Sequence, residues 1–408
     1  MSAPARAIEL GLRANAAQFA LLVVVNGFVG AMVGIERSLL PLLARDEFHV
    51  ASARGALAFL ITFGLAKASA NYATGYLAER VGRRQLLVLG WLLALPVPFM
   101  LRWAPSWSWV VAANLLLGLN QGLAWSATVV MKIDLVGPRR RGLALGVNEF
   151  AGYLAVALAA LGGGYLAARI GTREALFAGG LSVAAIGLAL SVLFVRDTGR
   201  HAAAEQELVR AGGGPLARDR APNARLGTFA VRQAGFVNNL NDGLAWGLLP
   251  LYFAAAGLGV RQIGWLAAIY PAVWAVAQIG AGALSDRIGR RVLIATGMAV
   301  QGVALAALAV GRDFTQWAAA AALLGLGTAA VYPTLIAQAS DLVSVAKRAG
   351  AVGTYRLWRD LGYVGGAVLA GVAADVVDAR AAIGGVGAVT AVSGLVAWRL
   401  LRPDPIHD

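Results

Sequence analysis

One short motif occurs twice in this chain, each time between two long apolar segments. Its copies read GYLAERVGRRQLL (residues 75–87) and GALSDRIGRRVLI (residues 282–294), and they lie 207 residues apart. Both copies keep the first glycine, an acid followed by an arginine, the second glycine and an Arg-Arg pair. A repeat at about half the chain length predicts two halves of similar architecture, because each copy marks the same point of one structural unit.

Composition indicates that these halves lie in a membrane. The chain has 408 residues, of which 59% are hydrophobic and only 14% are charged, whereas soluble domains carry about a quarter charged residues. A soluble core could not bury so much apolar surface, and the length accommodates about twelve spans. We therefore predict an all-α, multi-pass membrane protein. The expected spans are residues 17–41, 53–79, 85–103, 107–133, 141–169, 174–196, 228–256, 261–286, 291–311, 315–342, 347–375 and 380–401.

The distribution of charge gives the expected orientation of the chain. Its net charge of +14 would suit a nucleic-acid partner. However, about 23 of the 35 Lys and Arg residues fall in segments on one side of the proposed spans, as the positive-inside rule predicts for cytoplasmic loops. We therefore expect cytoplasmic termini and no nucleic-acid partner. The expected domains are a six-helix bundle (1–196), a cytoplasmic linker rich in charged residues, Gly and Pro (197–227), and a second six-helix bundle (228–408).

Few side chains suit catalysis or metal binding. The chain contains no cysteine, and its three histidines, His49, His201 and His407, are widely separated. No nucleophile and base occur in a recognisable arrangement. We therefore expect no metal site, no cofactor and no enzymatic activity.

The repeated spacing, small-x-x-x-acid-Arg-x-Gly-Arg-Arg, resembles the loop signature of the major facilitator superfamily between helices 2 and 3 and between helices 8 and 9. A second pattern, an acid seven residues before an arginine, occurs as Asp134/Arg141 and Asp341/Arg348. It resembles the other cytoplasmic charge motif of that family. The resemblance extends from about residue 17 to about residue 401. It implies the major facilitator fold, twelve transmembrane helices in two six-helix bundles related by a pseudo-twofold axis.

Together the two patterns predict a gate at the cytoplasmic ends of the helices, formed when that side is closed. Single exposed ion pairs contribute only about 0–1 kcal/mol, but several coupled pairs can bias two conformations by a few kcal/mol. Simple positive-inside anchoring would explain the arginines but not the acids at matching positions. The expected gate residues are Gly75, Glu79, Arg80, Gly82, Arg83, Arg84, Asp134, Arg141, Gly282, Asp286, Arg287, Gly289, Arg290, Arg291, Asp341 and Arg348.

Charged side chains at mid-membrane need partners, because an ionised group there costs several kcal/mol unless it is paired or hydrated. The resemblance implies that helix 2 lies beside helix 11 and helix 5 beside helix 8. Counting residues inward from the cytoplasmic helix ends then pairs side chains of equal depth. The expected contacts are Lys67 with Asp360, Glu149 with Gln278, and Asn71 with Arg356. Glu36 and Arg37, near the outer end of the first span, are expected to have a structural role at the membrane interface.

Asp242 is the preferred candidate for proton or substrate binding, because a titrating carboxylate can make movement between two states depend on occupancy. It shares a helix face with Asn238 and Asn241. The alternative role of Asp242 is a hydrogen bond that stabilises helix packing, and that of Glu149 and Asp360 is a fixed ion pair. The expected substrate- or proton-binding residues are Asp242, Asn238, Asn241, Gln121, Trp125, Lys67, Glu149, Arg356, Arg359, Asp360 and Tyr332.

The resemblance implies a secondary active transporter that moves a small solute by alternating access, with proton-coupled efflux as the leading mechanism. The cations Lys67, Arg356 and Arg359 also allow uptake or exchange of a small organic anion. A third possibility, from a different class, is a membrane receptor or scaffold that does not transport. The expected partners are a small-molecule substrate, protons and the lipid bilayer, and the expected setting is a monomer in a bacterial cytoplasmic membrane.

Overall fold

A computed structural model describes residues 9–137, 141–211, 224–342 and 348–401. In these ranges the chain forms fifteen helices and no strand. The helices are α1 (Ala16–Asp46), α2 (Ala53–Ala56), α3 (Ala58–Val81), α4 (Arg83–Ala94), α5 (Pro96–Arg102), α6 (Trp107–Val136), α7 (Arg141–Ile170), α8 (Thr172–Leu193), α9 (Gly199–Ala211), α10 (Ala224–Ala255), α11 (Val260–Ile288), α12 (Arg290–Val310), α13 (Phe314–Asp341), α14 (Arg348–Val376) and α15 (Ala379–Leu400).

The twelve expected spans correspond to these helices with small differences. The second span is α2 followed by α3, and the third is α4 followed by α5, since Pro96 lacks the N–H group that would continue α4. The predicted linker contains α9, and α10 begins at Ala224, inside that linker. Where the structure describes the chain, nine helical segments are both long and apolar enough to cross a membrane. Three others, α3, α10 and α14, have the length but carry more polar residues.

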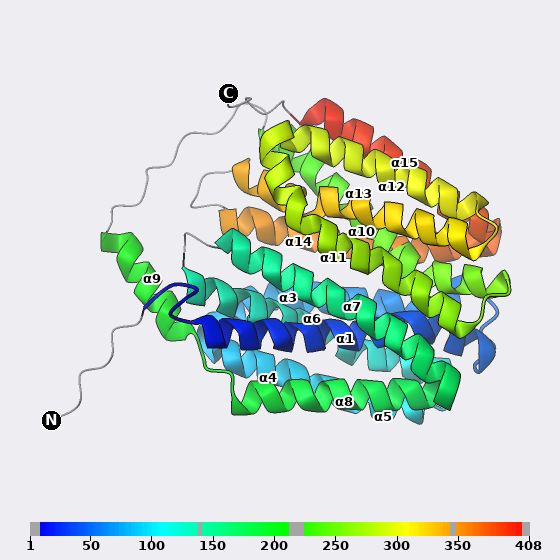
Figure 1. Cartoon of the computed structure of the whole chain (residues 1–408), viewed down its shortest axis with the longest axis horizontal. Helices are drawn as coiled ribbons and strands as arrows, with labels where there is room; N and C mark the ends of the chain where they lie inside the picture. Colours follow the sequence, from blue (N-terminus) through cyan, green and yellow to red (C-terminus); the bar gives the residue numbers. More distant parts are fainter. Residues whose placement is uncertain (1–8, 138–140, 212–223, 343–347, 402–408) are drawn as a thin grey trace.

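The two halves, α1–α8 and α10–α15, repeat the same packing (Figure 1). In the first half α1 packs on α7, and α3 packs on α6; in the second α10 packs on α14, and α11 packs on α13. The halves meet where α7 contacts α11 and where α3 contacts α14. Exchanging the halves converts one of these contacts into the other, as a pseudo-twofold axis requires.

The repeated motif forms the same turn in both halves. Gly82 separates α3 from α4 with a φ of 99°, and Gly289 separates α11 from α12 with a φ of 92°. Only glycine adopts this left-handed backbone without a steric penalty, which explains why both copies keep it. Both turns lie at the end of the molecule where α9 lies, here called the α9 end. The opposite end, where α2 lies, is called the α2 end.

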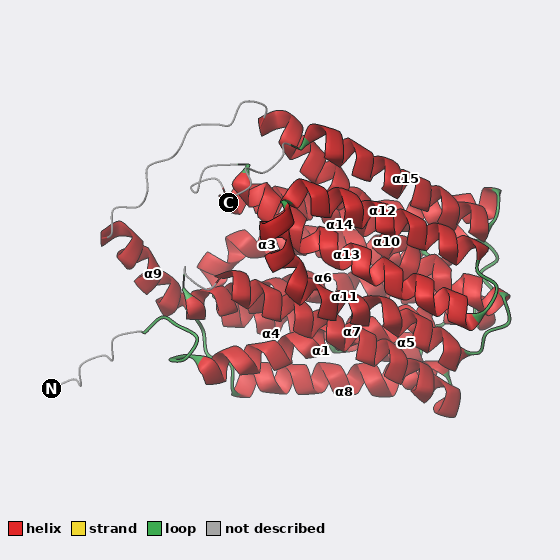
Figure 2. Ribbon diagram, turned by 45° about the horizontal axis from the view of Figure 1, so that its top comes forward, coloured by secondary structure: helices red, strands yellow, loops and turns green. Residues whose placement is uncertain are grey.

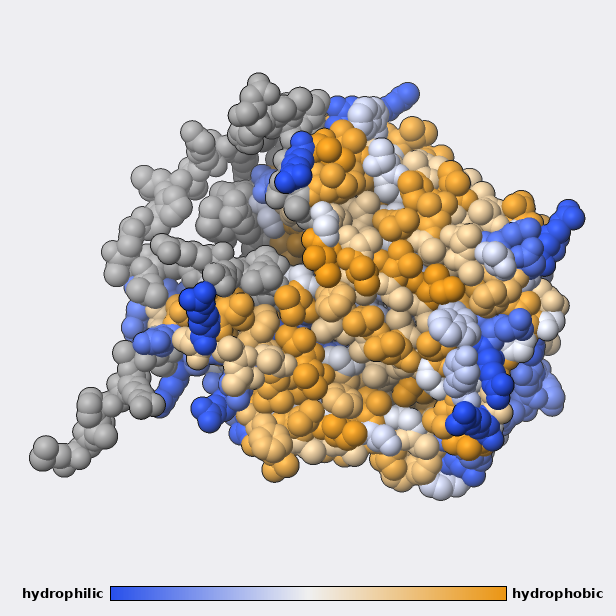
Figure 3. All heavy atoms as spheres, viewed as in Figure 1, coloured by the Kyte–Doolittle hydropathy of each residue, from blue (hydrophilic) through white to orange (hydrophobic). Residues whose placement is uncertain are grey.

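The surface between these ends is apolar. On the face shown in Figure 3, hydrophobic residues cover the middle of the molecule, and hydrophilic residues gather toward its two ends. Figure 2 shows the helices running through the middle, with the connecting loops at the ends. This arrangement matches a bilayer, where backbone groups must be satisfied within helices and loops reach water.

Close backbone contact between α10 and α14 positions the interior charges of the second half. A Cβ atom on Gly362 would lie 2.0 Å from the carbonyl oxygen of Phe236, and one on Gly243 would lie 2.2 Å from that of Tyr363. Side chains larger than hydrogen would force the helices apart. The small residues therefore bring the polar faces of α10 and α14 within reach of each other.

The two halves are in direct contact at the α2 end. The carboxylate of Asp375 on α14 accepts hydrogen bonds from the backbone N–H groups of Ala53 (2.5 Å) and Arg54 (3.1 Å) on α2. Nearby, a Cβ atom on Gly164 of α7 would lie only 3.1 Å from the Cα atom of Gly264 on α11. The structure is therefore closed at the α2 end.

Candidate functional site

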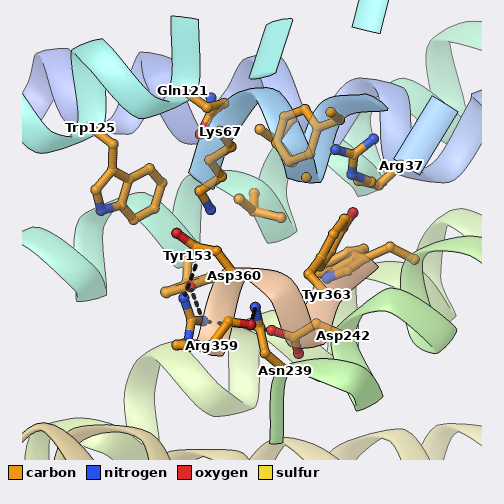
Figure 4. Close-up of a pocket in the computed structure, with 15 residues that line it drawn as sticks. Arg37, Lys67, Gln121, Trp125, Tyr153, Asn239, Asp242, Arg359, Asp360 and Tyr363 are labelled. Carbon is orange, nitrogen blue, oxygen red and sulfur yellow. Dashed lines mark hydrogen bonds and ion pairs between the residues drawn. The ribbon is translucent and has the colours of Figure 1, made fainter. Parts of the chain in front are cut away.

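A cavity of about 50 Å³ lies between the two halves, lined by residues of α1, α3, α6, α7, α10 and α14. The first half contributes Arg37, Lys67 and Gln121 to its polar lining. The second half contributes Asn239, Asp242, Arg359 and Asp360. Figure 4 shows these two sets facing each other across the cavity. Of the predicted site residues, Trp125 also lines it.

Asp242 and Arg359 form the centre of the second-half wall. The Arg359 Nη2 atom lies 3.7 Å from the Asp242 Oδ2 atom, and the Arg359 Nη1 atom lies 3.8 Å from the Asp360 Oδ1 atom. The hydroxyl of Tyr270 on α11 donates a hydrogen bond to Asp242. Arg359 also donates to the hydroxyl of Tyr153 on α7, 3.0 Å away, which connects the two halves. The buried cation thus has the acidic partners that its environment requires.

None of the three predicted contacts between helices forms as a hydrogen bond or ion pair, although Lys67 and Asp360 line the same cavity. Asp360 accepts a hydrogen bond from Asn71 Nδ2 at 2.8 Å, so Asn71 reaches α14 one turn away from the expected Arg356. Lys67 lies on the same cavity but forms no hydrogen bond or ion pair with a described residue; its Nζ atom is 5.9 Å from the ring centroids of Phe63 and Trp125. Counting residues ignores the sliding of one helix along another, and one turn is about 5.4 Å.

Glu149 forms no hydrogen bond with Gln278, whose Nε2 atom is buried and without a hydrogen-bond partner among the described residues. Instead it accepts hydrogen bonds from Trp125 Nε1 (3.1 Å) and the Tyr332 hydroxyl (3.2 Å). Because Tyr332 belongs to the second half, this network also joins the halves. It brings together three of the predicted site residues, Glu149, Trp125 and Tyr332. Arg356 neither lines the cavity nor forms a hydrogen bond or ion pair with a described residue.

Asn238 and Asn241, predicted to bind substrate with Asp242, instead hold the second half together. Asn241 Nδ2 donates to Gln301 Oε1 on α12 at 2.6 Å, and Gln301 Nε2 donates to Asn238 Oδ1 at 3.0 Å. Thr390 on α15 donates to Asn241. Helical spacing alone could not separate this face from the adjacent one, where Asn239 lines the cavity.

Sequence reasoning missed several cavity residues, most notably Arg37. Glu36 and Arg37 are buried inside the protein, with 3% and 0% exposed surface, and not at the membrane interface. The reason is that α1 continues to Asp46, so these residues lie deeper than a helix ending near residue 41 predicts. For Glu36 and Arg37, only the length of the apolar run that surrounds them could have indicated their burial. Tyr153 on α7 also lines the cavity and was not predicted.

At the α9 end, each copy of the motif makes an equivalent ion pair. Arg83 Nε lies 3.2 Å from Asp134 Oδ2, and Arg290 pairs with Asp341, at positions related by the 207-residue repeat. Thr198, just before α9, also donates to Asp134 at 2.6 Å.

The remaining gate residues fall into three groups. Arg84 and Arg291 have other partners, the Val192 carbonyl oxygen and the Trp398 ring, while Arg80 and Arg287 are exposed. The structure does not describe the side-chain positions of the other predicted gate residues, Gly75, Glu79, Arg141, Gly282, Asp286 and Arg348. Among the described residues, no group of three His, Asp or Glu side chains could hold a metal ion.

Comparisons with known proteins agree with this architecture. The chain is 26% identical to the multidrug resistance protein MdtG of Citrobacter koseri over 357 residues, 85% of this chain and 84% of MdtG. It is 31% identical to the proton-coupled antiporter flippase LtaA of Staphylococcus saprophyticus over 98 residues, about a quarter of each chain. The crystal structure of a POT peptide transporter in complex with alafosfalin has a TM-score of 0.75 and 14% identity, covering 96% of this chain and 98% of that one.

A family comparison extends over nearly the whole sequence. The family described as Major Facilitator Superfamily matches residues 19–230 and 234–408. These ranges include both copies of the repeated motif and every helix that lines the cavity. The chain therefore belongs to the major facilitator superfamily.

Proposed function

We propose that this protein is a secondary active transporter that exports a small solute across the cytoplasmic membrane in exchange for protons. The observation that carries the proposal is Asp242, a buried carboxylate on the cavity between the two halves. It contacts α11 through Tyr270 and α14 through Arg359. A change in its charge therefore acts on three helices that must move relative to one another.

Protonation of Asp242 removes the negative charge that holds Arg359. Since Arg359 also donates to Tyr153 in the first half, loss of the Asp242 charge changes the contact between the halves. A group that binds a proton differently in two conformations shifts their populations by that difference in affinity. Asp242 is thus suited to couple proton binding to alternating access. The similarity to a multidrug resistance protein, MdtG, and to a proton-coupled antiporter flippase, LtaA, supports efflux.

The repeated ion pairs at the α9 end are proposed to form the gate on the cytoplasmic side. Arg83 with Asp134 and Arg290 with Asp341 connect helix ends within each half. The other motif residues, including Glu79 and Asp286, are proposed to complete the network when this end closes. In this proposal residues 1–196 and 228–408 are the moving units, residues 197–227 with α9 are their linker, and the protein acts as a monomer.

Everted membrane vesicles test the proposed coupling. Respiration acidifies their interior, and we expect an exported compound to release protons, which an acridine dye reports as recovery of fluorescence. Asp242→Asn should abolish this recovery, because the asparagine cannot take up a proton. The matched control is Asp313→Asn, at an exposed helix cap outside the cavity, which should retain it. Recovery at the wild-type rate in Asp242→Asn would contradict the proposal.

A further inference from the structure

Arg37 is a fully buried cation without a hydrogen-bond partner. Its exposed surface is 0%, and none of its Nε, Nη1 and Nη2 atoms has an acceptor among the described residues. The guanidinium lies 4.1 Å from the ring centroid of Phe63, 5.4 Å from that of Phe59 and 5.8 Å from that of Tyr363. Its planar group is therefore held in place by aromatic rings while its donors remain unused.

Aromatic contacts alone are a poor substitute for an anionic partner. A cation–π contact contributes about 0.5–2 kcal/mol, whereas an unpaired buried charge costs several kcal/mol even after relaxation of its surroundings. The neighbouring Glu36 does not form an ion pair with Arg37, and its Oε2 atom is itself without a partner in the described part of the chain. The guanidinium therefore keeps its capacity to bind an anion.

Arg37 lines the central cavity, and a second cation lies on the same wall. Lys67, also from the first half, forms no ion pair with a described residue. On the opposite wall the acids already have partners, because Asp242 and Asp360 both lie near Arg359. Figure 4 shows Arg37 and Lys67 on one side and these acids on the other. The first-half wall therefore presents two cations, neither of which forms an ion pair with a described residue.

We propose that Arg37, assisted by Lys67, binds a carboxylate group of the transported compound, an inference that rests on the proposed transport function. The planar fork of a guanidinium matches the two oxygens of a carboxylate, which a lysine ammonium cannot do. The rings of Trp125, Tyr153 and Trp246 line the same cavity and suit the organic part of such a compound. The substrate class is thus an organic acid with an apolar or aromatic body.

Thermal unfolding of the purified full-length protein tests this assignment. The probes are acetate, benzoate and 1-naphthoate at neutral pH, each compared with its uncharged amide and with sodium chloride at equal ionic strength. We expect at least one carboxylate to raise the Tm by a few degrees, since a ligand that binds only the folded state stabilises it. The amides and chloride should not. Equal shifts for every acid and its amide would overturn the proposal.

Substitution of Arg37 separates binding from structure. Arg37→Gln should lose the difference between acid and amide, whereas Arg312→Gln, which removes an exposed arginine from the loop between α12 and α13, should keep it. A purely structural arginine would lower the basal Tm of Arg37→Gln and leave the difference intact, which would overturn the proposal. If Arg37→Gln does not fold, Arg37→Lys keeps the charge but not the fork. Its affinity should fall about tenfold or more, and an unchanged affinity would contradict the assignment.

The carboxylate site and the transport function can be contradicted separately, because the thermal measurements need neither a membrane nor a proton gradient. Proton release driven only by compounds without a carboxylate, together with no stabilisation by the acids, would overturn the substrate class and leave transport standing. Stabilisation that depends on Arg37, without proton release by any of the probes, would leave the carboxylate site standing and contradict proton exchange.

Discussion

At the scale of single residues, the cavity separates buried charges that are paired from those that are not. Arg359 has Asp242 and Asp360 nearby, donates to Tyr153, and lies 4.2 Å from the ring centroid of Tyr332. The Arg37 guanidinium lies beside three aromatic rings and has no hydrogen-bond acceptor among the described residues. Since water is scarce in such a site, pairing decides whether a charge holds the structure together or is ready for a ligand.

The stability of the protein should depend on Arg359 much more than on Arg356. Arg359→Gln leaves two buried acids without their cation, and breaking a buried pair in this way costs about 3–5 kcal/mol. Arg356→Gln, one turn away on the same helix, removes no hydrogen bond or ion pair seen in the described residues and should have little effect. Denaturant unfolding in detergent micelles measures both, and equal losses would contradict the assigned pairing.

At the scale of elements, a short helix and a distant carboxylate close the α2 end. The helix α2 has only four residues, and the Asp375 side chain accepts from two of their backbone N–H groups. An acid at a helix N-terminus satisfies donors that the helix leaves free. In this protein the acid comes from the other half, so the cap also joins the two bundles.

Asp375→Ala should make the α2 end open more often. Loss of a helix cap costs about 1 kcal/mol, which corresponds to an increase of about fivefold in the open population. Since the chain has no cysteine, a single Val33→Cys in the cavity can report opening by its rate of modification with a membrane-impermeant maleimide.

Asp378→Ala is the matched control for this experiment. Asp378 caps α15 within the second half, where it accepts from the N–H group of Ala381 at 2.7 Å. It should not change the rate of modification, because it does not join the halves. If the reporter cysteine at position 33 is modified no faster in the Asp375→Ala protein than in the Asp378→Ala protein, the role of Asp375 in closure is contradicted.

At the scale of the whole molecule, the distribution of charge predicts the orientation in the membrane. The cationic motif turns and α9 share one end, whereas α2 lies at the other. Positively charged loops remain in the cytoplasm during insertion. The α9 end should therefore be cytoplasmic, with the closed α2 end outside.

Two single cysteines test this orientation. Ser106→Cys, in the loop before α6 at the α2 end, should react with an impermeant maleimide in intact cells, since Ser106 is exposed. Ala203→Cys, exposed on α9, should react only after the cells are opened. The reverse pattern of labelling would contradict the proposed orientation and, with it, the assignment of the gate to the cytoplasmic side.

The sequence by itself determined the class of protein and the plan of its fold. Long apolar segments cannot avoid a bilayer, and a motif repeated after 207 residues requires two similar halves, so the helices and their order follow from local composition and spacing. It also identified Asp242, Lys67, Arg359 and Asp360 as interior charges, because charged residues in apolar helices are rare.

Only the tertiary structure decided which of these residues meet. Asn71 rather than Lys67 contacts Asp360, and Asn239 rather than Asn238 faces the cavity. Which residues meet depends on how far one packed helix is shifted along its neighbour, here by one helical turn, and on how far each helix is rotated about its own axis. These are set by contacts such as that of Gly362 with Phe236. The depth of Arg37 was decided in the same way, because a helix that ends at Asp46 places it in the interior. Periodicity along one helix carries no information about the position of its neighbour, and the site exists only between neighbours.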